Sequence, residues 1–244
     1  MARSDRFAGQ TVVVTGGTGG IGRAVCAGFA AEGAHVVTLD VPGSGATHEV
    51  DVRDGAAVRE AMRQAYAVHS RLDVLVTLAG GSLGTPRDLE VIEEEHVDLV
   101  VDVNVKGTFY CCQAAMPYLA AAGGGSIVTT SSIGGRQPSP VTGVPYAASK
   151  AAVLGLTRRL AREAGASGVR VNAVAPGLFL TGRLQQMYDQ MPAAERDEVL
   201  RAIPLARFPD LREIVEPILF LASGESSYIT GVVLDVNGGR FMPL

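Results

Sequence analysis

The stretch TVVVTGGTGGIG, residues 11–22, joins a β-branched apolar run to a cluster of glycines. β-Branched residues favour a strand, and the apolar periodicity of IGRAVCAGFAAEG (21–33) predicts a helix directly after the glycines. Glycines at such a junction let the backbone approach a pyrophosphate, and the helix N-terminus attracts its negative charge. The stretch therefore predicts the first βαβ unit of a dinucleotide-binding fold.

The same alternation of strand and helix continues along the chain. The expected strands are apolar almost throughout, which is typical of a parallel sheet covered by helices on both faces. Strands are expected at 11–15, 35–40, 72–80, 126–132, 169–176 and 230–239, and the later helices at 54–69, 97–121, 146–164 and 212–223. The pattern predicts an α/β fold with a doubly wound parallel sheet in three α/β/α layers. With no linker or repeat, residues 1–244 are expected to form a single domain.

Two segments depart from this alternation. The chain between Asp40 and Asp51 is too short for a helix and a strand, so the usual crossover helix should be missing there. The polar segment 178–212 follows a strand end, where ligands bind in open α/β sheets. It is interpreted as a lid over the substrate, and the alternative is a solvent-exposed elaboration without a role.

Composition and charge exclude several classes of protein. With 47% hydrophobic and 19% charged residues, the chain is expected to fold into a globule. Its net charge of −4 gives no reason to expect nucleic acid or an anionic membrane as a partner. The histidines and the three cysteines show no ligand spacing, so no metal is expected. The N-terminus lacks the apolar core of a signal peptide, and a cytoplasmic location is the default expectation.

The residues expected to bind the dinucleotide begin in the glycine turn. They are Gly16, Thr18, Gly19, Gly20, Ile21 and Gly22. Asp40 ends the second strand, where a carboxylate can bind both ribose hydroxyls and repel a 2′-phosphate, which favours NAD over NADP. The alternative for Asp40 is an ordinary turn residue at a strand end. Asp51 is expected at the adenine edge, and its alternative role is to cap a helix.

Four residues form the candidate catalytic group. Tyr146 and Lys150 are four apart and share one helix face, where an ammonium should lower the pKa of the phenol towards working pH. Such a tyrosine can exchange a proton with a substrate hydroxyl or carbonyl. Ser132 ends a strand and could bind the substrate oxygen, with Ser131 as a rival, and Asn104 could tie a water relay to Lys150. A tyrosine and a lysine four residues apart usually belong to an ordinary helix surface. The glycine turn upstream favours a catalytic role for Tyr146 and Lys150.

Taken together, these motifs resemble those of the short-chain dehydrogenase/reductase family, in its single-domain branch with a Rossmann fold. The resemblance covers nearly the whole chain. The motifs are TGGTGGIG (15–22), Asp51-Val52, NVKGTF (104–109), SSIGG (131–135), YAASK (146–150), PGLFLT (176–181) and TGVVLDVNGG (230–239).

The resemblance implies roles for individual residues. Asn104, Ser132, Tyr146 and Lys150 match the catalytic tetrad of the family, and Lys150 would also hold the nicotinamide ribose. Thr181 would meet the carboxamide, and the residues from Val174 to Gly177, Pro176 among them, would line the nicotinamide. The family commonly has Asn-Ala-Gly where this chain has Leu78, Ala79 and Gly80. The loss of that amide puts the local geometry in doubt, while Ala79, Gly80 and Val52 remain expected cofactor contacts.

These motifs and the resemblance predict an NAD(H)-dependent oxidoreductase that interconverts a secondary alcohol and a ketone, with Tyr146 as general acid and base. A mostly apolar or cyclic substrate is a weak preference, because the segments 134–145, 178–212 and 240–244 contain little charge to clamp an anion apart from Arg136 and Arg183. Some relatives that oxidise cyclic dihydrodiols share the shortened segment after Asp40. One alternative is a catalytically silent dinucleotide-binding regulator or scaffold. A nucleotide-sugar epimerase is a third, but it would have a longer C-terminal domain. The resemblance also implies a homotetramer with interfaces at 212–223 and the final strand.

Overall fold

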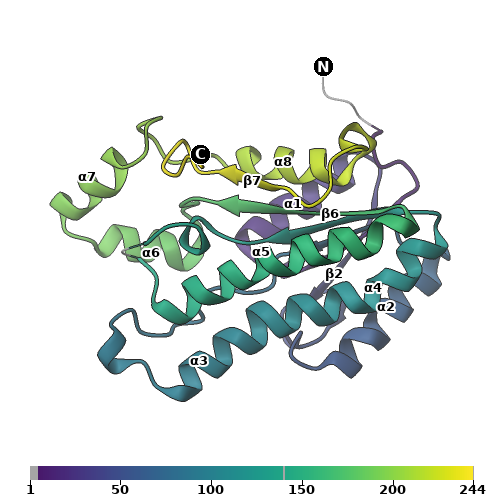
Figure 1. The fold of residues 1–244 in the computed structure, drawn as a ribbon, viewed down its shortest axis with the longest axis horizontal. Helices are drawn as coiled ribbons and strands as arrows, with labels where there is room; N and C mark the ends of the chain where they lie inside the picture. Colours follow the sequence, from purple (N-terminus) through teal and green to yellow (C-terminus); the bar gives the residue numbers. More distant parts are fainter. Residues whose placement is uncertain (1–4, 140, 244) are drawn as a thin grey trace.

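The protein is built around a seven-stranded sheet in which every neighbouring pair of strands is parallel. The structure, a computed structural model, describes residues 5–139 and 141–243. The sheet order is β3-β2-β1-β4-β5-β6-β7. The strands are β1 (Thr11–Thr15), β2 (His35–Asp40), β3 (His48–Glu49), β4 (Val74–Thr77), β5 (Gly125–Thr130), β6 (Val169–Pro176) and β7 (Val233–Val236). The predicted doubly wound parallel fold is confirmed (Figure 1).

Helices cover both faces of the sheet (Figure 1). One core cluster joins the sheet to α2, α4 and α5, and a second joins it to α1 and α8. The helices are α1 (Gly20–Ala31), α2 (Gly55–His69), α3 (Glu94–Val101), α4 (Thr108–Ala121), α5 (Val144–Ala164), α6 (Gly182–Gln190), α7 (Ala193–Arg201) and α8 (Arg212–Ala222). Among the described residues, no helix is long and apolar enough to cross a membrane.

The first strand shows why an apolar run without alternation suits this position. Val13 packs in the cluster with α2 and α4, whereas Val12 and Val14 face the cluster with α1 and α8. Successive side chains of a strand point to opposite faces, so a strand buried on both faces needs apolar residues at every position. Each of these valines is fully buried.

Some expected boundaries were wrong. The strands expected at 72–80 and 230–239 are reduced to Val74–Thr77 and Val233–Val236. Both runs end in glycines with positive φ, such as Gly80 and Gly238, which turn the chain out of the sheet. The helix expected at 97–121 begins earlier, at Glu94, and passes through a π-helical turn, Asp102–Gly107, before α4.

The missing crossover helix between β2 and β3 is confirmed, and a compact turn takes its place. The Glu49 carboxylate accepts hydrogen bonds from the backbone N–H groups of Gly43 (3.0 Å) and Gly45 (2.9 Å). These two bonds hold the pKa of Glu49 below its usual value. Thr38 and Thr47 also bond each other across the turn, through backbone N–H and hydroxyl groups. The segment that follows Asp40 is therefore ordered by specific contacts.

The segment 178–212 contains the two helices α6 and α7, which project beyond the carboxyl end of β6 at the left of Figure 1. Tyr188 of α6 packs edge-on against Phe208, with ring centroids 4.8 Å apart. This contact joins α6 to the later part of the segment 178–212, so Tyr188 contributes to packing within the segment.

Arg170 fastens the end of α8 to the sheet. From β6, its guanidinium donates to the backbone carbonyls of Leu221 (2.8 Å), Ala222 (3.2 Å) and Ser223 (2.8 Å), and to Ser226 Oγ (2.6 Å). These carbonyls are among those that a helix end leaves without partners, and a cation there also suits the helix dipole. One partly buried side chain thus satisfies several acceptors together.

We expect Arg170→Met to lower the free energy of unfolding by about 2 kcal/mol, because buried acceptors lose their donors. Urea unfolding followed by circular dichroism measures the change. Arg158→Met, at an exposed position of α5, is the matched control and should change stability by less than about 0.5 kcal/mol. Equal losses in the two variants would contradict this role of Arg170.

Candidate active site

The turn from Gly16 to Gly22 forms a cradle, a hollow in the backbone that side chains at these glycines would fill. Gly16 has φ +68°, and a Cβ on it would lie 2.7 Å from the backbone nitrogen of Ala79. A Cβ on Gly22 would overlap the carbonyl oxygen of Gly16. No side chain caps α1, whose N-cap is Gly19, so its first N–H groups remain for a ligand. A pyrophosphate fits this uncapped helix start.

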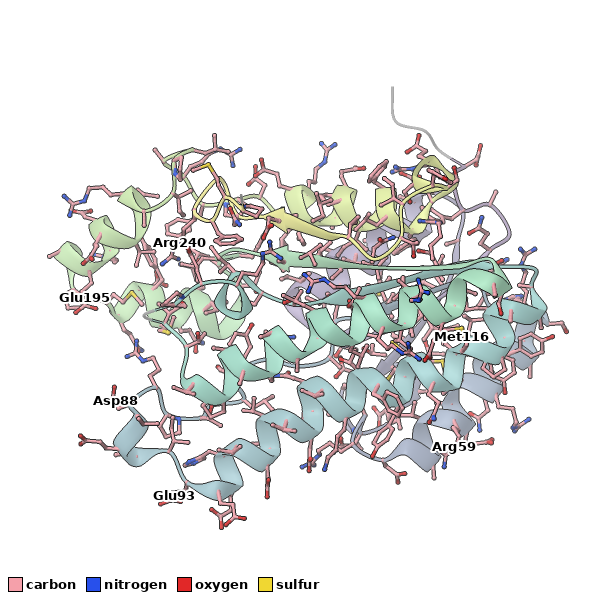
Figure 2. All side chains as sticks on the ribbon, viewed as in Figure 1. Arg59, Asp88, Glu93, Met116, Glu195 and Arg240 are labelled. Atoms are coloured by element: carbon pink, nitrogen blue, oxygen red, sulfur yellow. The ribbon has the colours of Figure 1, made fainter. Side chains whose placement is uncertain are left out.

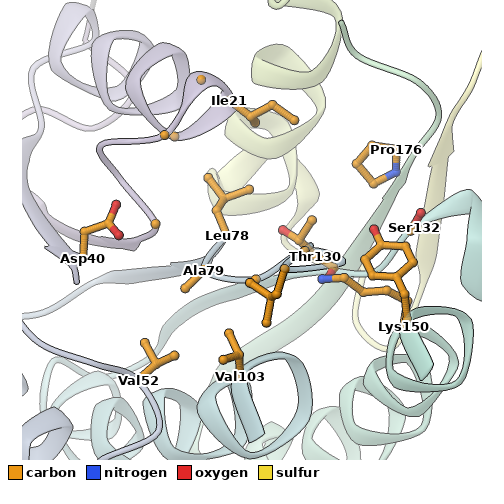
Figure 3. A pocket seen from close by; sticks show the side chains of 18 of the residues that line it. Ile21, Asp40, Val52, Leu78, Ala79, Val103, Thr130, Ser132, Lys150 and Pro176 are labelled. Atoms are coloured by element: carbon orange, nitrogen blue, oxygen red, sulfur yellow. The ribbon is translucent and has the colours of Figure 1, made fainter. Parts of the chain in front are cut away.

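Asp40 lies at one end of the cavity that begins at this turn (Figure 3). Its Oδ2 accepts hydrogen bonds from the backbone nitrogen (3.0 Å) and the hydroxyl (2.5 Å) of Thr18. Its Oδ1 accepts from the nitrogen of Val41 (2.9 Å). These contacts tie the carboxylate to the glycine turn, so its orientation is set before a ligand arrives.

Asp51 and Val52 line the same cavity near Asp40. Arg53 Nη2 lies 2.6 Å from Asp51 Oδ2, and this guanidinium holds the pKa of Asp51 below its usual value. The alternative role of Asp51 as a helix cap is wrong, because Asp54 accepts the bonds from the first turn of α2. Asp51 therefore does not cap the helix, and its carboxylate forms an ion pair with Arg53.

Leu78, the departure from the family pattern, is accommodated by Thr15. Leu78 packs against the core cluster with α1 and α8, and its N–H donates to the carbonyl of Thr15 (3.0 Å). The Thr15 hydroxyl accepts from the nitrogen of Ala79 (3.2 Å). Two bonds to one threonine thus hold the chain at Leu78 and Ala79, beside Gly80 in the wall of the cavity.

Ser132 and Lys150 lie at the opposite end of the cavity from Asp40 (Figure 3), and Tyr146 lines the same cavity. Lys150 is 5% exposed, and its Nζ donates to the carbonyl of Thr130 (2.9 Å), which ends β5. Ser132 makes a hydrogen bond with the Tyr146 side chain. Ser131, the alternative to Ser132, is 2% exposed, and its hydroxyl donates a hydrogen bond to the carbonyl of Lys150 (2.7 Å). The geometry therefore favours Ser132 as the hydroxyl beside Tyr146.

The expected lowering of the Tyr146 pKa by Lys150 was wrong. Burial raises the pKa of Tyr146, and the hydrogen bond with Ser132 offsets this only in part. Lys150 Nζ lies 5.9 Å from the centre of the tyrosine ring. Burial also lowers the pKa of Lys150 to about 8. Two neighbouring buried groups are thus both pushed towards their neutral forms.

Asn104 braces the wall of the cavity through hydrogen bonds to Gly81 and Ser149. Its Nδ2 donates to Gly81 O (3.0 Å) and Ser149 Oγ (2.9 Å), and its Oδ1 accepts from Gly81 N (2.9 Å). The side-chain donors of Asn104 are therefore used within the wall of the cavity. Sequence reasoning missed the partners Gly81, Ser149 and Thr130, because backbone carbonyls and a helix serine carry no motif.

Thr181, Pro176 and Gly177 also border the site. A Cβ on Gly20 would lie 2.8 Å from Thr181 Cβ, so the threonine stands directly across from the glycine turn. Gly177 N donates to the carbonyl of Val236 (2.8 Å), which ties this turn to β7. All three residues line the first cavity, whose volume is about 580 Å³. The structure thus brings most of the expected site residues to one cavity wall. The exceptions are Thr18, which reaches the wall through Asp40, Asn104, and the fully buried Val174 and Ala175 of β6.

A second cavity, of about 760 Å³, opens beside the first and shares Ser132, Tyr146, Gly177 and Thr181 with it. Its outer wall comes from the segment 178–212, through Leu184, Gln186, Met187 and Gln190. Of its described lining residues, Arg87 alone carries a charge. The tyrosine and the serine therefore stand where two cavities meet, one extending to Asp40 and the other to the helix α6. Within the described ranges, no cluster of three or more metal-ligating side chains is found.

Comparisons with known proteins agree with this geometry. The family model described as Enoyl-(Acyl carrier protein) reductase matches residues 16–240. The chain belongs to the short-chain dehydrogenase/reductase family, whose members act on alcohols and ketones with a nicotinamide dinucleotide. The predicted enzyme class is thereby confirmed.

Individual relatives cover nearly the whole chain. It is 38% identical to the 3-oxoacyl-[acyl-carrier-protein] reductase of Thermotoga maritima, over 96% of this chain and 98% of that protein. It is 35% identical to the 2-dehydro-3-deoxy-L-rhamnonate dehydrogenase (NAD(+)) of a Sphingomonas species, over 96% of each. The crystal structure of levodione reductase superposes with a TM-score of 0.90 at 30% identity, over 96% of this chain and 98% of that one.

We expect Gly22→Ala to abolish dinucleotide binding, because its methyl group would overlap the backbone of Gly16 and displace the turn. Quenching of protein fluorescence or calorimetric titration with NAD and NADP measures the loss. Gly155→Ala is the control: a Cβ there meets nothing within 4 Å. It lies inside α5, where alanine should add up to about 1 kcal/mol of stability. Normal binding by Gly22→Ala would refute the cradle.

Proposed function

We propose that this protein is an NAD(H)-dependent dehydrogenase that interconverts a secondary alcohol, a cyclic one included, and its ketone, with Tyr146 as general acid and base. The observation that carries the proposal is the position of Tyr146 and Ser132 at the junction of two cavities. Bound in the cavity that reaches Asp40, the dinucleotide supplies or accepts the hydride. The second cavity, covered by 178–212 as a lid, takes the substrate.

The proton steps belong to the chain's own residues. Ser132 donates a hydrogen bond to the substrate oxygen and holds it against the Tyr146 hydroxyl. Because burial raises the pKa of Tyr146, the phenol is protonated at neutral pH and can give its proton to a ketone oxygen. Oxidation needs the phenolate, which forms as the pH rises towards the raised pKa of Tyr146. Lys150 also binds the nicotinamide ribose, and Asn104 keeps the loop at Gly81 in place.

The preference for NAD rests on Asp40. Its carboxylate is fixed by Thr18 and Val41 at the end of β2, and a 2′-phosphate there would meet a negative charge. Glu49, its partner in the β2–β3 register, adds a second carboxylate nearby. The one arginine in the described wall of this cavity, Arg53, is paired with Asp51. The name of one relative, with NAD(+), agrees with this preference.

The substrate is proposed to be uncharged. The described lining of the second cavity combines Ser82, Ser139, Gln186 and Gln190 with apolar residues, and has a charge only at Arg87. Such a lining has no pair of cations to clamp an anion. The names of the relatives span an acyl-carrier-protein substrate, a sugar acid and levodione, so they do not choose among substrates.

We further propose a homotetramer in the cytoplasm. Two features support the assembly: β7 is an edge strand whose outer side has no partner strand in the sheet, and Phe109 on α4 is 41% exposed. Exposed apolar residues and an open sheet edge are typical of surfaces that self-associate.

We expect wild-type protein to reduce NAD with a member of a panel of secondary and cyclic alcohols, and Tyr146→Phe to lose at least about 100-fold in kcat. Absorbance of the reduced nicotinamide gives the rates. The oxidation rate should rise with pH through the alkaline range, because deprotonation of a phenol of raised pKa supplies the base. Tight NAD binding without turnover of any alcohol would instead support the silent regulator.

We expect Asp40→Asn to shift the ratio of kcat/KM for NADP over NAD upward by roughly 10-fold or more, because a like-charge contact with the 2′-phosphate is removed. Steady-state kinetics with both dinucleotides measures the ratio. Glu60→Gln removes an exposed carboxylate of α2 outside the cavity and should leave the ratio unchanged. A wild-type preference for NADP would overturn the role of Asp40.

A further inference from the structure

An unmatched cation lies behind the active site. Arg240 follows β7 and sits between that strand and the segment that carries α6 and α7 (Figure 2). Its guanidinium Nη1 is shielded from solvent and has no hydrogen-bond partner among the described residues. Burial lowers the pKa of Arg240. Arg240 is partly buried, and shielding part of a guanidinium from water is costly unless a polar or negative group pairs with it.

A second donor without a partner stands beside this cation. Asn237 is 9% exposed, and its Oδ1 accepts hydrogen bonds from the nitrogens of Gly239 (3.0 Å) and Phe241 (3.3 Å). These two bonds define which end of the amide is the oxygen. Nδ2 must therefore point the other way, and it too is buried without a partner.

Both side chains line a cavity of about 270 Å³ at the base of the segment 178–212. Its described charged residues can be matched one by one. Arg207 binds Glu213 through two hydrogen bonds of 2.7 and 2.6 Å. Asp235 faces Arg136, with 3.0 Å between Oδ1 and Nε. Arg240 is left with one positive charge and no counterion.

We propose that this cavity binds a small carboxylate, with Arg240 and Nδ2 of Asn237 as its donors. One charge is expected, because Asp235 and Glu213 in the same wall would repel a doubly charged anion. Leu178, Ile203 and Leu205 supply apolar surface for a short alkyl chain. The volume lies just below the range of about 300–1,000 Å³ for sites of drug-sized ligands, so the ligand has only a few carbons.

The site lies close enough to the reaction cleft to influence it. A Cβ on Gly177 would lie 3.0 Å from Asn237 Cα, and Gly177 lines both larger cavities. Leu178 lines the carboxylate site and the second cavity together. A ligand at Arg240 therefore contacts the start of the proposed lid from outside the cleft, without competing for the dinucleotide or the alcohol.

The test is thermal unfolding of the full chain with butyrate or with butyramide, its uncharged analogue, at constant ionic strength. A ligand at free concentration c that binds only the folded state stabilises it by RT ln(1 + c/Kd), so Tm rises with the logarithm of ligand concentration above Kd. We expect butyrate to raise the Tm of the wild type and butyramide to leave it unchanged. Arg240→Gln should need at least 10-fold more butyrate for the same shift, and Arg240→Lys should retain part of the response. Arg212→Gln, at an exposed position of α8, should respond as the wild type does.

Asn237→Asp gives an independent arm if Arg240→Gln does not fold. Its carboxylate would supply the counterion internally, so the butyrate response should disappear while the fold is kept. Equal responses in wild type and Arg240→Gln, or no response to butyrate in the wild type, would overturn the proposal. A smaller oligomer in Arg240→Gln without any butyrate response would assign the missing carboxylate to a second copy of the chain and would overturn it as well. No outcome depends on turnover, so the result is separate from that for the dehydrogenase.

Discussion

The hydrogen bond from Lys150 Nζ to the carbonyl of Thr130 is the interaction on which the site depends. It joins α5 to the end of β5 in a nearly solvent-free place, where a lone ammonium would be costly. The same helix carries Tyr146, and the residues after β5 lead directly to Ser132. Fixing one buried cation to one backbone oxygen therefore sets the tyrosine against the serine. The hydroxyl of Ser131 adds a second bond between these segments.

A parallel sheet makes this arrangement possible. All carboxyl ends of parallel strands lie at one edge, so the glycine turn after β1, Asp40 at the end of β2 and Ser132 after β5 face the same crevice. The helices on both faces bury the rest of each strand. Polar groups gather at this edge because here the backbone leaves the sheet, and its N–H and C=O groups become available to side chains and ligands.

Some buried or partly buried cations have acceptors or carboxylates as partners, and others have no carboxylate partner among the described residues. Arg170 satisfies the end of α8, and Arg136 faces Asp235. Lys150 is buried and Arg240 is partly buried, neither forms an ion pair with a carboxylate among the described residues, and burial lowers the pKa of each. Retaining such groups costs stability, so they are the places where ligands are expected. One of them stands in the reaction cleft, and the other stands behind the turn at Gly177, at the base of the segment 178–212.

The sequence by itself determined the order of the main strands and helices, although not the short strand β3. It also determined the glycine turn, the missing crossover helix after Asp40 and the short list of reactive side chains. These are local properties: propensity, periodicity and chain length act over neighbouring residues. The shift of the Tyr146 pKa, the choice of Ser132 over Ser131 and the partners of Asn104 were decided only by the tertiary structure. Each depends on burial and on backbone groups from distant segments, such as Thr130 and Gly81. The same holds for the pairing of charges around Arg240, because no local pattern reveals which cation packing leaves without a partner.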